Sequence, residues 1–180
     1  MPRSSRWPPS APDPIFVIDT CSLARMKETE VLKIDEQFAF FSAMTPMLQR
    51  GALAFPRQVA KELARAQYPD TPGAWATGVK NLVIYPDPSD DSMAEVLGAA
   101  QLIDANGDDE YEEADPYLVA MAYDIQEHYP NSRVVVVSDD VKDRLPRKES
   151  VLTACTRLRI ACIGASDFVD HLRNSVINHP

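Results

Sequence analysis

The chain has 180 residues, 45% of them hydrophobic and 25% charged, and a net charge of −9. This length and composition are typical of a single globular domain. No apolar run approaches the roughly 20 residues that span a bilayer, and the first fourteen residues lack the apolar segment of a secretory signal. Three cysteines without a CxxC or Cys/His spacing argue against a disulfide framework or a zinc site, so we expect a cytoplasmic protein without a membrane partner.

The negative charge is unevenly distributed along the chain. Residues 81–132 contain thirteen Asp and Glu residues and no Lys or Arg, whereas the rest of the chain has fourteen acids and eighteen bases. Most of the acids in 81–132 can be explained without a function, as the solvent-exposed surface of an ordinary protein. Because the distribution of charge decides which face meets a phosphate, the overall sign does not exclude a nucleic-acid partner.

Apolar and turn residues in chain order predict an alternation of strands and helices. Residues 1–14 are expected to be a disordered Pro-rich tail, 15–174 a single domain, and 175–180 a C-terminal tail. Strands are predicted at 15–18, 51–56, 82–85, 134–137 and 160–163, and helices at 22–27, 35–49, 58–67, 73–80, 92–104, 114–128, 150–158 and 166–174. The alternation predicts a three-layer α/β/α fold whose central sheet has four to five mostly parallel strands.

Several carboxylates fall where the carboxyl ends of parallel strands meet, which is the usual place for a functional crevice. Asp19 ends the first strand, Asp139 and Asp140 follow the strand at 134–137, Asp115 starts a helix, and Glu62 lies in the helix after the second strand. Carboxylates from separate segments, without a His or Cys pattern, favour a hard divalent cation such as Mg²⁺ or Mn²⁺.

Each of these acids also has a structural interpretation. Asp19 can cap the next helix, although a carboxylate after four buried residues is costly unless it is paired or metal-bound. Glu62 can face solvent, Asp115 can be a helix-start acid favoured by the helix dipole, and Asp139 and Asp140 can form a turn.

Four segments together resemble the PIN domain family. They are Ile15–Ser22, which reads IFVIDTCS, Pro56–Leu63, which reads PRQVAKEL, Ala114–Ala122, which reads ADPYLVAMA, and Val136–Asp140, which reads VVSDD. The order agrees from about Ile15 to Leu172, and the late segment Cys155–Cys162 is similar to a poorly characterised subgroup related to VapC-type toxin ribonucleases. Cys21 departs from the Asn or Ser that is common at its position.

The resemblance implies a metal-dependent ribonuclease, the toxin of a toxin–antitoxin pair, in which a metal-activated water hydrolyses a phosphodiester. It implies metal-binding roles for Asp19, Glu62, Asp115 and Asp140, and a hydrogen-bonding role for Ser138 within the site. Asp139 and Asp143 stay open as alternatives for the fourth acid, and Glu112 and Glu113 as additional ligands. An RNA substrate, an antitoxin protein and a homodimer are the implied partners.

Basic residues near the acids are candidates for binding the phosphate backbone. Arg57, Lys61 and Arg65 recur at four-residue steps on the helix that carries Glu62, and Lys142, Arg144, Arg147 and Lys148 follow the Asp139–Asp140 turn. Three rival functions stay open: a thiol mechanism at Cys21, for which no nearby His partner is evident, an Asp-dependent phosphatase, and a non-catalytic PIN-like module that binds a protein.

Overall fold

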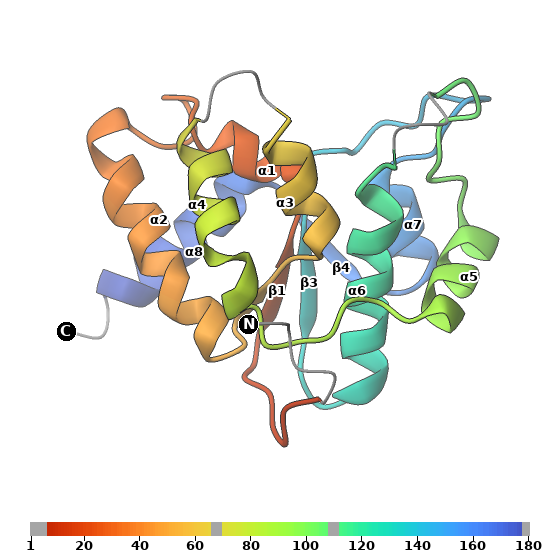
Figure 1. Ribbon diagram of the computed structural model, residues 1–180, viewed down its shortest axis with the longest axis horizontal. Coiled ribbons are helices and arrows are strands. Elements are labelled where there is room, and N and C mark those ends of the chain that lie inside the picture. Colours follow the sequence, from red (N-terminus) through yellow and green to blue (C-terminus); the bar gives the residue numbers. More distant parts are fainter. Residues whose placement is uncertain (1–6, 66–69, 108–111, 178–180) are drawn as a thin grey trace.

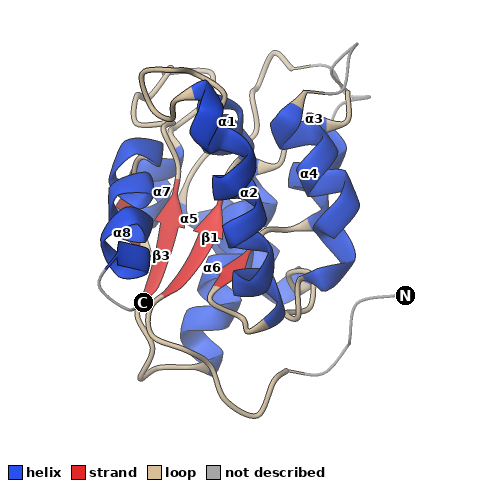
Figure 2. Ribbon diagram, turned by 90° about the vertical axis from the view of Figure 1, so that its left-hand side faces the viewer, coloured by secondary structure: helices blue, strands red, loops and turns tan. Residues whose placement is uncertain are grey.

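The computed structural model describes residues 7–65, 70–107 and 112–177. Within these ranges, four parallel strands form one open sheet in the order β2-β1-β3-β4, with helices on both faces (Figures 1 and 2). The strands are β1 (Ile15–Ile18), β2 (Leu53–Ala54), β3 (Val134–Val137) and β4 (Ala161–Ile163). The three-layer α/β/α fold predicted from the sequence is confirmed.

The helices begin close to the polar residues that can cap them. Asp19, Asp70, Ser89 and Ser150 accept backbone N–H groups at the starts of α1, α4, α5 and α7. The helices are α1 (Thr20–Arg25), α2 (Ile34–Gln49), α3 (Arg57–Leu63), α4 (Thr71–Val79), the 3₁₀ helix η1 (Lys80–Leu82), α5 (Asp90–Ala99), α6 (Asp115–His128), α7 (Val151–Arg157) and α8 (Ala165–Ile177). No helix in the described part of the chain is both long and apolar enough to cross a membrane.

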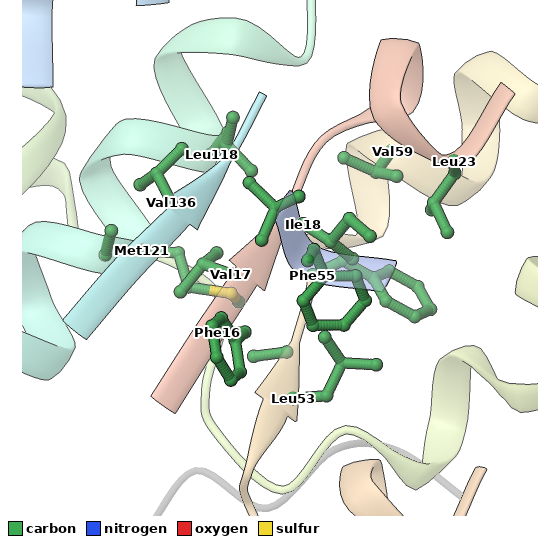
Figure 3. Packing of buried hydrophobic residues seen from close by; sticks show 14 of the residues in the cluster. Phe16, Val17, Ile18, Leu23, Leu53, Phe55, Val59, Leu118, Met121 and Val136 are labelled. Atoms are coloured by element: carbon green, nitrogen blue, oxygen red, sulfur yellow. The ribbon is translucent and has the colours of Figure 1, made fainter. Parts of the chain in front are cut away.

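Strand β1 lies at the centre of the hydrophobic core. All four of its side chains are buried, and residues of β2, β3, α3 and α6 surround it (Figure 3). On one face of the sheet the ring of Phe168 in α8 packs edge-on against Phe16, with 5.0 Å between the ring centroids. Burial on both faces explains why β1 and β3 are continuous β-branched and aromatic runs rather than alternating ones.

Several predicted elements differ in the structure: the strand expected at 51–56 is only Leu53–Ala54, and the helix expected at 58–67 ends at Leu63. The apolar run 82–85 is not a strand: η1 ends at Leu82, and the chain continues without pairing to the sheet. Val83 and Tyr85 are buried instead, and the hydroxyl of Tyr85 donates to the carbonyl of Gly51 at 2.7 Å. Helix α5 spans Asp90–Ala99 rather than 92–104, because Ser89 caps its start and the backbone becomes extended at Ala100.

The residues just before the first strand pack against the domain, so the expected tail outside the fold is wrong for residues 7–14. Trp7 stacks on His128 at 4.5 Å between ring centroids and also contacts Tyr85 and Tyr129. A large indole ring buries enough apolar surface to hold such a segment in place. Residues 1–6 lie outside the described ranges, and at the other end α8 includes residues 175–177, which were expected to belong to a tail.

Candidate functional site

The register of the two central strands places Asp19 beside Ser138. Ile18 pairs with Val137, so the residues that follow β1 and β3 emerge together at the carboxyl edge of the sheet. The Ser138 hydroxyl donates to Asp19 Oδ2 at 2.7 Å, and the Thr20 N–H donates to Oδ1 at 2.6 Å. The Cys21 thiol also donates to Oδ2, at 2.9 Å. Asp19 is therefore both the cap of α1 and a buried acid at the sheet edge.

Burial dominates the electrostatics of Asp19. Only 2% of the residue is exposed, and removal from water raises the pKa of its carboxyl group. The hydrogen bonds from Cys21, Ser138 and Thr20 oppose that rise, and the nearby charge of Glu62 adds to it. The fold holds a desolvated carboxyl group here by giving its two oxygens three donors.

Glu62 joins helix α3 to the start of α6. Its Oε1 atom accepts the backbone N–H of Ala114 at 2.7 Å, directly before Asp115. On the same helix, Gln58 donates to the carbonyl of Glu112. These two contacts bring the predicted acid of α3 next to the predicted acid of α6, although they are 53 positions apart in the sequence.

The predicted acids converge on one cavity of about 340 Å³ at the carboxyl edge of the sheet. Five carboxylates from four segments line it together with a single basic side chain. The lining residues are Asp19, Thr20, Cys21, Glu62, Asp115, Asp139, Asp140 and Arg144. Asp143 is not among them. It accepts the backbone N–H and the hydroxyl of Ser150 and the hydroxyl of Thr153 at the start of α7. We call this cavity the acidic pocket.

The adjacent acids Asp139 and Asp140 have different surroundings. Asp139 accepts Arg25 Nη1 at 2.7 Å, the Ser22 hydroxyl at 2.6 Å and the Ala165 N–H at 3.1 Å. The Asp140 side chain accepts the Val151 N–H at 3.2 Å, and its Oδ1 atom lies 3.6 Å from the guanidinium of Arg144. Asp139 thus ties β3 to α1 and α8, whereas Asp140 has more freedom to bind a ligand.

Asp115 lies deep in the pocket and is paired with a lysine. Lys148 Nζ is 2.5 Å from Asp115 Oδ2, and it also donates to Glu113. Burial and the charge of Asp19 nevertheless raise the pKa of Asp115 to about 7, against the opposing effect of Lys148. The mutual repulsion of these acids is the electrostatic condition that a bound cation relieves.

The carboxylate and hydroxyl oxygens of the acidic pocket are of the type that a hard divalent cation binds. The Thr20 hydroxyl oxygen is buried and has no hydrogen-bond partner among the described residues, so a polar group is left for a ligand or its water. In the described part of the chain, however, no three Asp, Glu, His or Cys side chains already enclose an ion position. Cation binding therefore requires side chains such as Glu62 or Asp140 to turn toward a common point.

The basic residues predicted to bind phosphate fall into separate groups. Arg57 and Lys61 line a second cavity of about 410 Å³ together with Lys80, which we call the basic pocket. Arg57 pairs with Asp87 at 3.0 Å. Arg65 follows the end of α3 and is exposed, but it does not line this cavity.

The four basic residues after the Asp139–Asp140 turn do not form one exposed surface. Arg144 lines the acidic pocket and Lys142 is exposed, whereas Arg147 pairs with Asp104 at 2.7 Å. The expected position of Lys148 at the rim of the crevice is wrong, because its side chain is only 7% exposed and is bound to two carboxylates. The sequence patterns did not indicate Arg25, which binds Asp139, or Lys80, which lines the basic pocket.

A family profile described as a domain of unknown function, DUF4411, matches residues 16–176. The chain belongs to this family. No curated protein matches the sequence. The DUF4411 match covers all five carboxylates of the acidic pocket and all three bases of the basic pocket, and its description carries no activity. The resemblance to PIN domains therefore stays a prediction from the four sequence segments.

Proposed function

We propose that this protein is a divalent-metal-dependent ribonuclease that cleaves phosphodiester bonds at the acidic pocket. One observation carries the proposal: carboxylates from four separate segments line a single cavity at the carboxyl edge of a parallel sheet. Bound Mg²⁺ or Mn²⁺ would supply an activated water and offset the charge of the scissile phosphate. Asp19, Glu62, Asp115 and Asp140 would hold the ion.

The chain's own residues have distinct tasks in this proposal. Ser138 and Thr20 orient Asp19, so that its carboxylate stays at the floor of the pocket. Glu62 fixes the start of α6 and thereby the position of Asp115. Arg144, which lines the pocket and is more than half exposed, is placed to meet a phosphate oxygen.

The surroundings of Cys21 argue against the thiol mechanism. Burial and the adjacent charge of Asp19 raise the pKa of the thiol above its ordinary value, and the thiol donates its hydrogen bond to that carboxylate. A thiol with a raised pKa is a poor nucleophile at neutral pH. Hydrolysis by water fits the pocket better than attack by sulfur.

The PIN-like segments favour a cytoplasmic toxin of the VapC type, held inactive by an antitoxin protein. A small gene next to this one that encodes a protein co-purifying with the chain would support that setting. If the chain is purified alone and its expression does not affect growth, the ribonuclease proposal stands without the toxin role.

The test is cleavage of a fluorescent single-stranded RNA with Mn²⁺ or Mg²⁺ and with EDTA. We expect cleavage with metal, none with EDTA, and recovery when metal is added in excess. Asp19→Asn should lower the rate by at least about 100-fold, because one of the ligand carboxylates loses its charge. The same substitution should leave the melting temperature unchanged or raise it, because it removes one of the clustered charges.

Glu127→Gln is the matched control, since Glu127 is exposed on α6 and far along the helix from Asp115. It should retain full activity. Equal activity in Asp19→Asn and the wild type would mean that the cleavage comes from a contaminating nuclease or from another site. If well-folded protein with Mn²⁺ cleaves neither RNA nor DNA, the non-catalytic alternative would replace the ribonuclease.

A further inference from the structure

Lys148 is a buried cation inside a group of acids. Its side chain is 7% exposed, and those of its partners Glu113 and Asp115 are 15% and 16% exposed. A lysine is rarely buried to this extent unless it is paired, and here two carboxylates share one ammonium group. The ammonium thus occupies a position between two acids where a divalent cation would otherwise be favoured.

The backbone around Lys148 holds it in this position. Arg144 and Lys148 form an antiparallel bridge, in which the Arg144 N–H donates to the Lys148 carbonyl at 2.8 Å. Next to it, the Glu149 N–H donates to the Gln101 carbonyl at 2.7 Å, and the Ala105 N–H donates to the Arg147 carbonyl at 3.0 Å. The segment that carries Lys148 is therefore anchored on both sides to the chain that follows α5.

Each of the two carboxylates that Lys148 binds has one oxygen held by the ammonium. Glu113 uses its other oxygen to accept the Asp104 N–H at 2.9 Å, and Asp115 directs Oδ2 at the ammonium. Asp19, Glu62 and Asp140 line the rest of the acidic pocket, whereas the ion pairs of Lys148 are with Glu113 and Asp115. The pocket is thus divided into a side neutralised by the protein and a side that is still rich in negative charge.

We propose that the Lys148 ammonium is a built-in cation that fills the Glu113–Asp115 side of the acidic pocket and limits the site to one divalent ion. This inference rests on the proposed metal-dependent function. It makes Lys148 a positioning residue, which acts through Glu113 and Asp115 rather than on the substrate. The single ion then lies on the side of Asp19, Glu62 and Asp140, and Asp115 contributes the oxygen that Lys148 does not bind.

The test is a titration of the full chain with Mn²⁺, followed by the electron paramagnetic resonance signal of the free ion. The wild type should bind one Mn²⁺ per chain. Lys148→Met removes the charge but keeps an unbranched side chain of similar length, so it should bind two. Lys148→Arg keeps a cation and should still bind one, and so should Lys142→Met, which removes an exposed lysine of the same loop.

Thermal unfolding gives a second readout, because Lys148→Met leaves two buried carboxylates unpaired and unfolds more easily in EDTA. Added Mn²⁺ should raise its melting temperature more than that of the wild type. A variant that stays unfolded at saturating Mn²⁺ contradicts the proposal, as does a stoichiometry of one in folded Lys148→Met or of two in the wild type. Absence of any Mn²⁺ binding by the wild type would instead reject the metal-dependent function itself.

Discussion

Helix α3 separates two pockets of opposite charge. Glu62 on one side lines the acidic pocket, and Arg57 and Lys61 on the other line the basic pocket with Lys80. In the acidic pocket Asp19 is buried and Asp115 largely so, whereas all three bases of the other pocket are exposed. Charges removed from water interact strongly, and charges in water are screened. The two pockets should therefore respond very differently to substitution.

The largest expected effect is a change of the free energy of unfolding with pH, caused by Asp115 in the acidic pocket. The pKa of Asp115 is about 7 in the folded protein, above its ordinary value of 3.8, so the folded state binds this proton more tightly than the unfolded chain. The contribution of this carboxyl group to the free energy of unfolding is therefore greatest below pH 4, and it is lost as the pH rises through about 7. The loss is up to about 4 kcal/mol.

Urea unfolding between pH 4 and pH 8 in EDTA measures this effect. Asp115→Asn keeps the shape of the side chain and should flatten the difference between the two pH values. Lys61→Ala, a change in the exposed pocket, should leave the pH dependence as it is in the wild type. Identical pH profiles for Asp115→Asn and the wild type would show that the acidic pocket is no more sensitive than the surface.

The next largest effect is a difference in stability and activity between variants of the adjacent acids Asp139 and Asp140. Asp139→Asn weakens the contacts with Arg25, Ser22 and Ala165, and the expected loss of stability is about 1–3 kcal/mol. Asp140→Asn should change stability by less than about 1 kcal/mol, because its contacts are longer and its partner Arg144 is exposed. The loss of cleavage should have the opposite order, with Asp140→Asn the more severe.

The free energy of unfolding in denaturant and the cleavage rate should both be measured for the two variants. A larger activity loss in Asp139→Asn, at equal fraction folded, would make Asp139 the fourth acid of the site. Asp143→Asn provides the reference, since Asp143 binds Ser150 and Thr153 at the start of α7 outside the pocket and should affect stability without affecting the reaction.

The smallest effect is expected in the basic pocket. Replacing Arg57, Lys61 and Lys80 with Ala should leave the folded domain intact and weaken binding of a non-cleavable single-stranded RNA. The slope of log K against log salt should become shallower by about 0.7 for each phosphate contact that is lost. Lys33→Ala with Arg50→Ala, two exposed bases at the ends of α2, should keep the original slope. An unchanged slope in the triple variant would place the RNA on another face.

The sequence alone determined the fold class and most of the acid set. Two buried β-branched runs, each followed by a carboxylate or a Ser-Asp-Asp turn, already require parallel strands with acids at one edge. The repeating apolar spacing in residues 35–49 and 114–128 likewise predicted α2 and α6 within a residue or two. These features are local, so they can be read from residues close together in the chain.

Only the tertiary structure decided which charges meet. The run 82–85 has the apolar character of a strand, but the sheet ends at β2, and Val83 and Tyr85 are buried in the core without pairing to a strand. Lys148 belongs to a basic segment that the sequence predicts to be exposed. In the structure its backbone pairs with Arg144, and its side chain is buried against Glu113 and Asp115. Burial and pairing between distant segments are set by packing of the whole chain, and no local spacing encodes them.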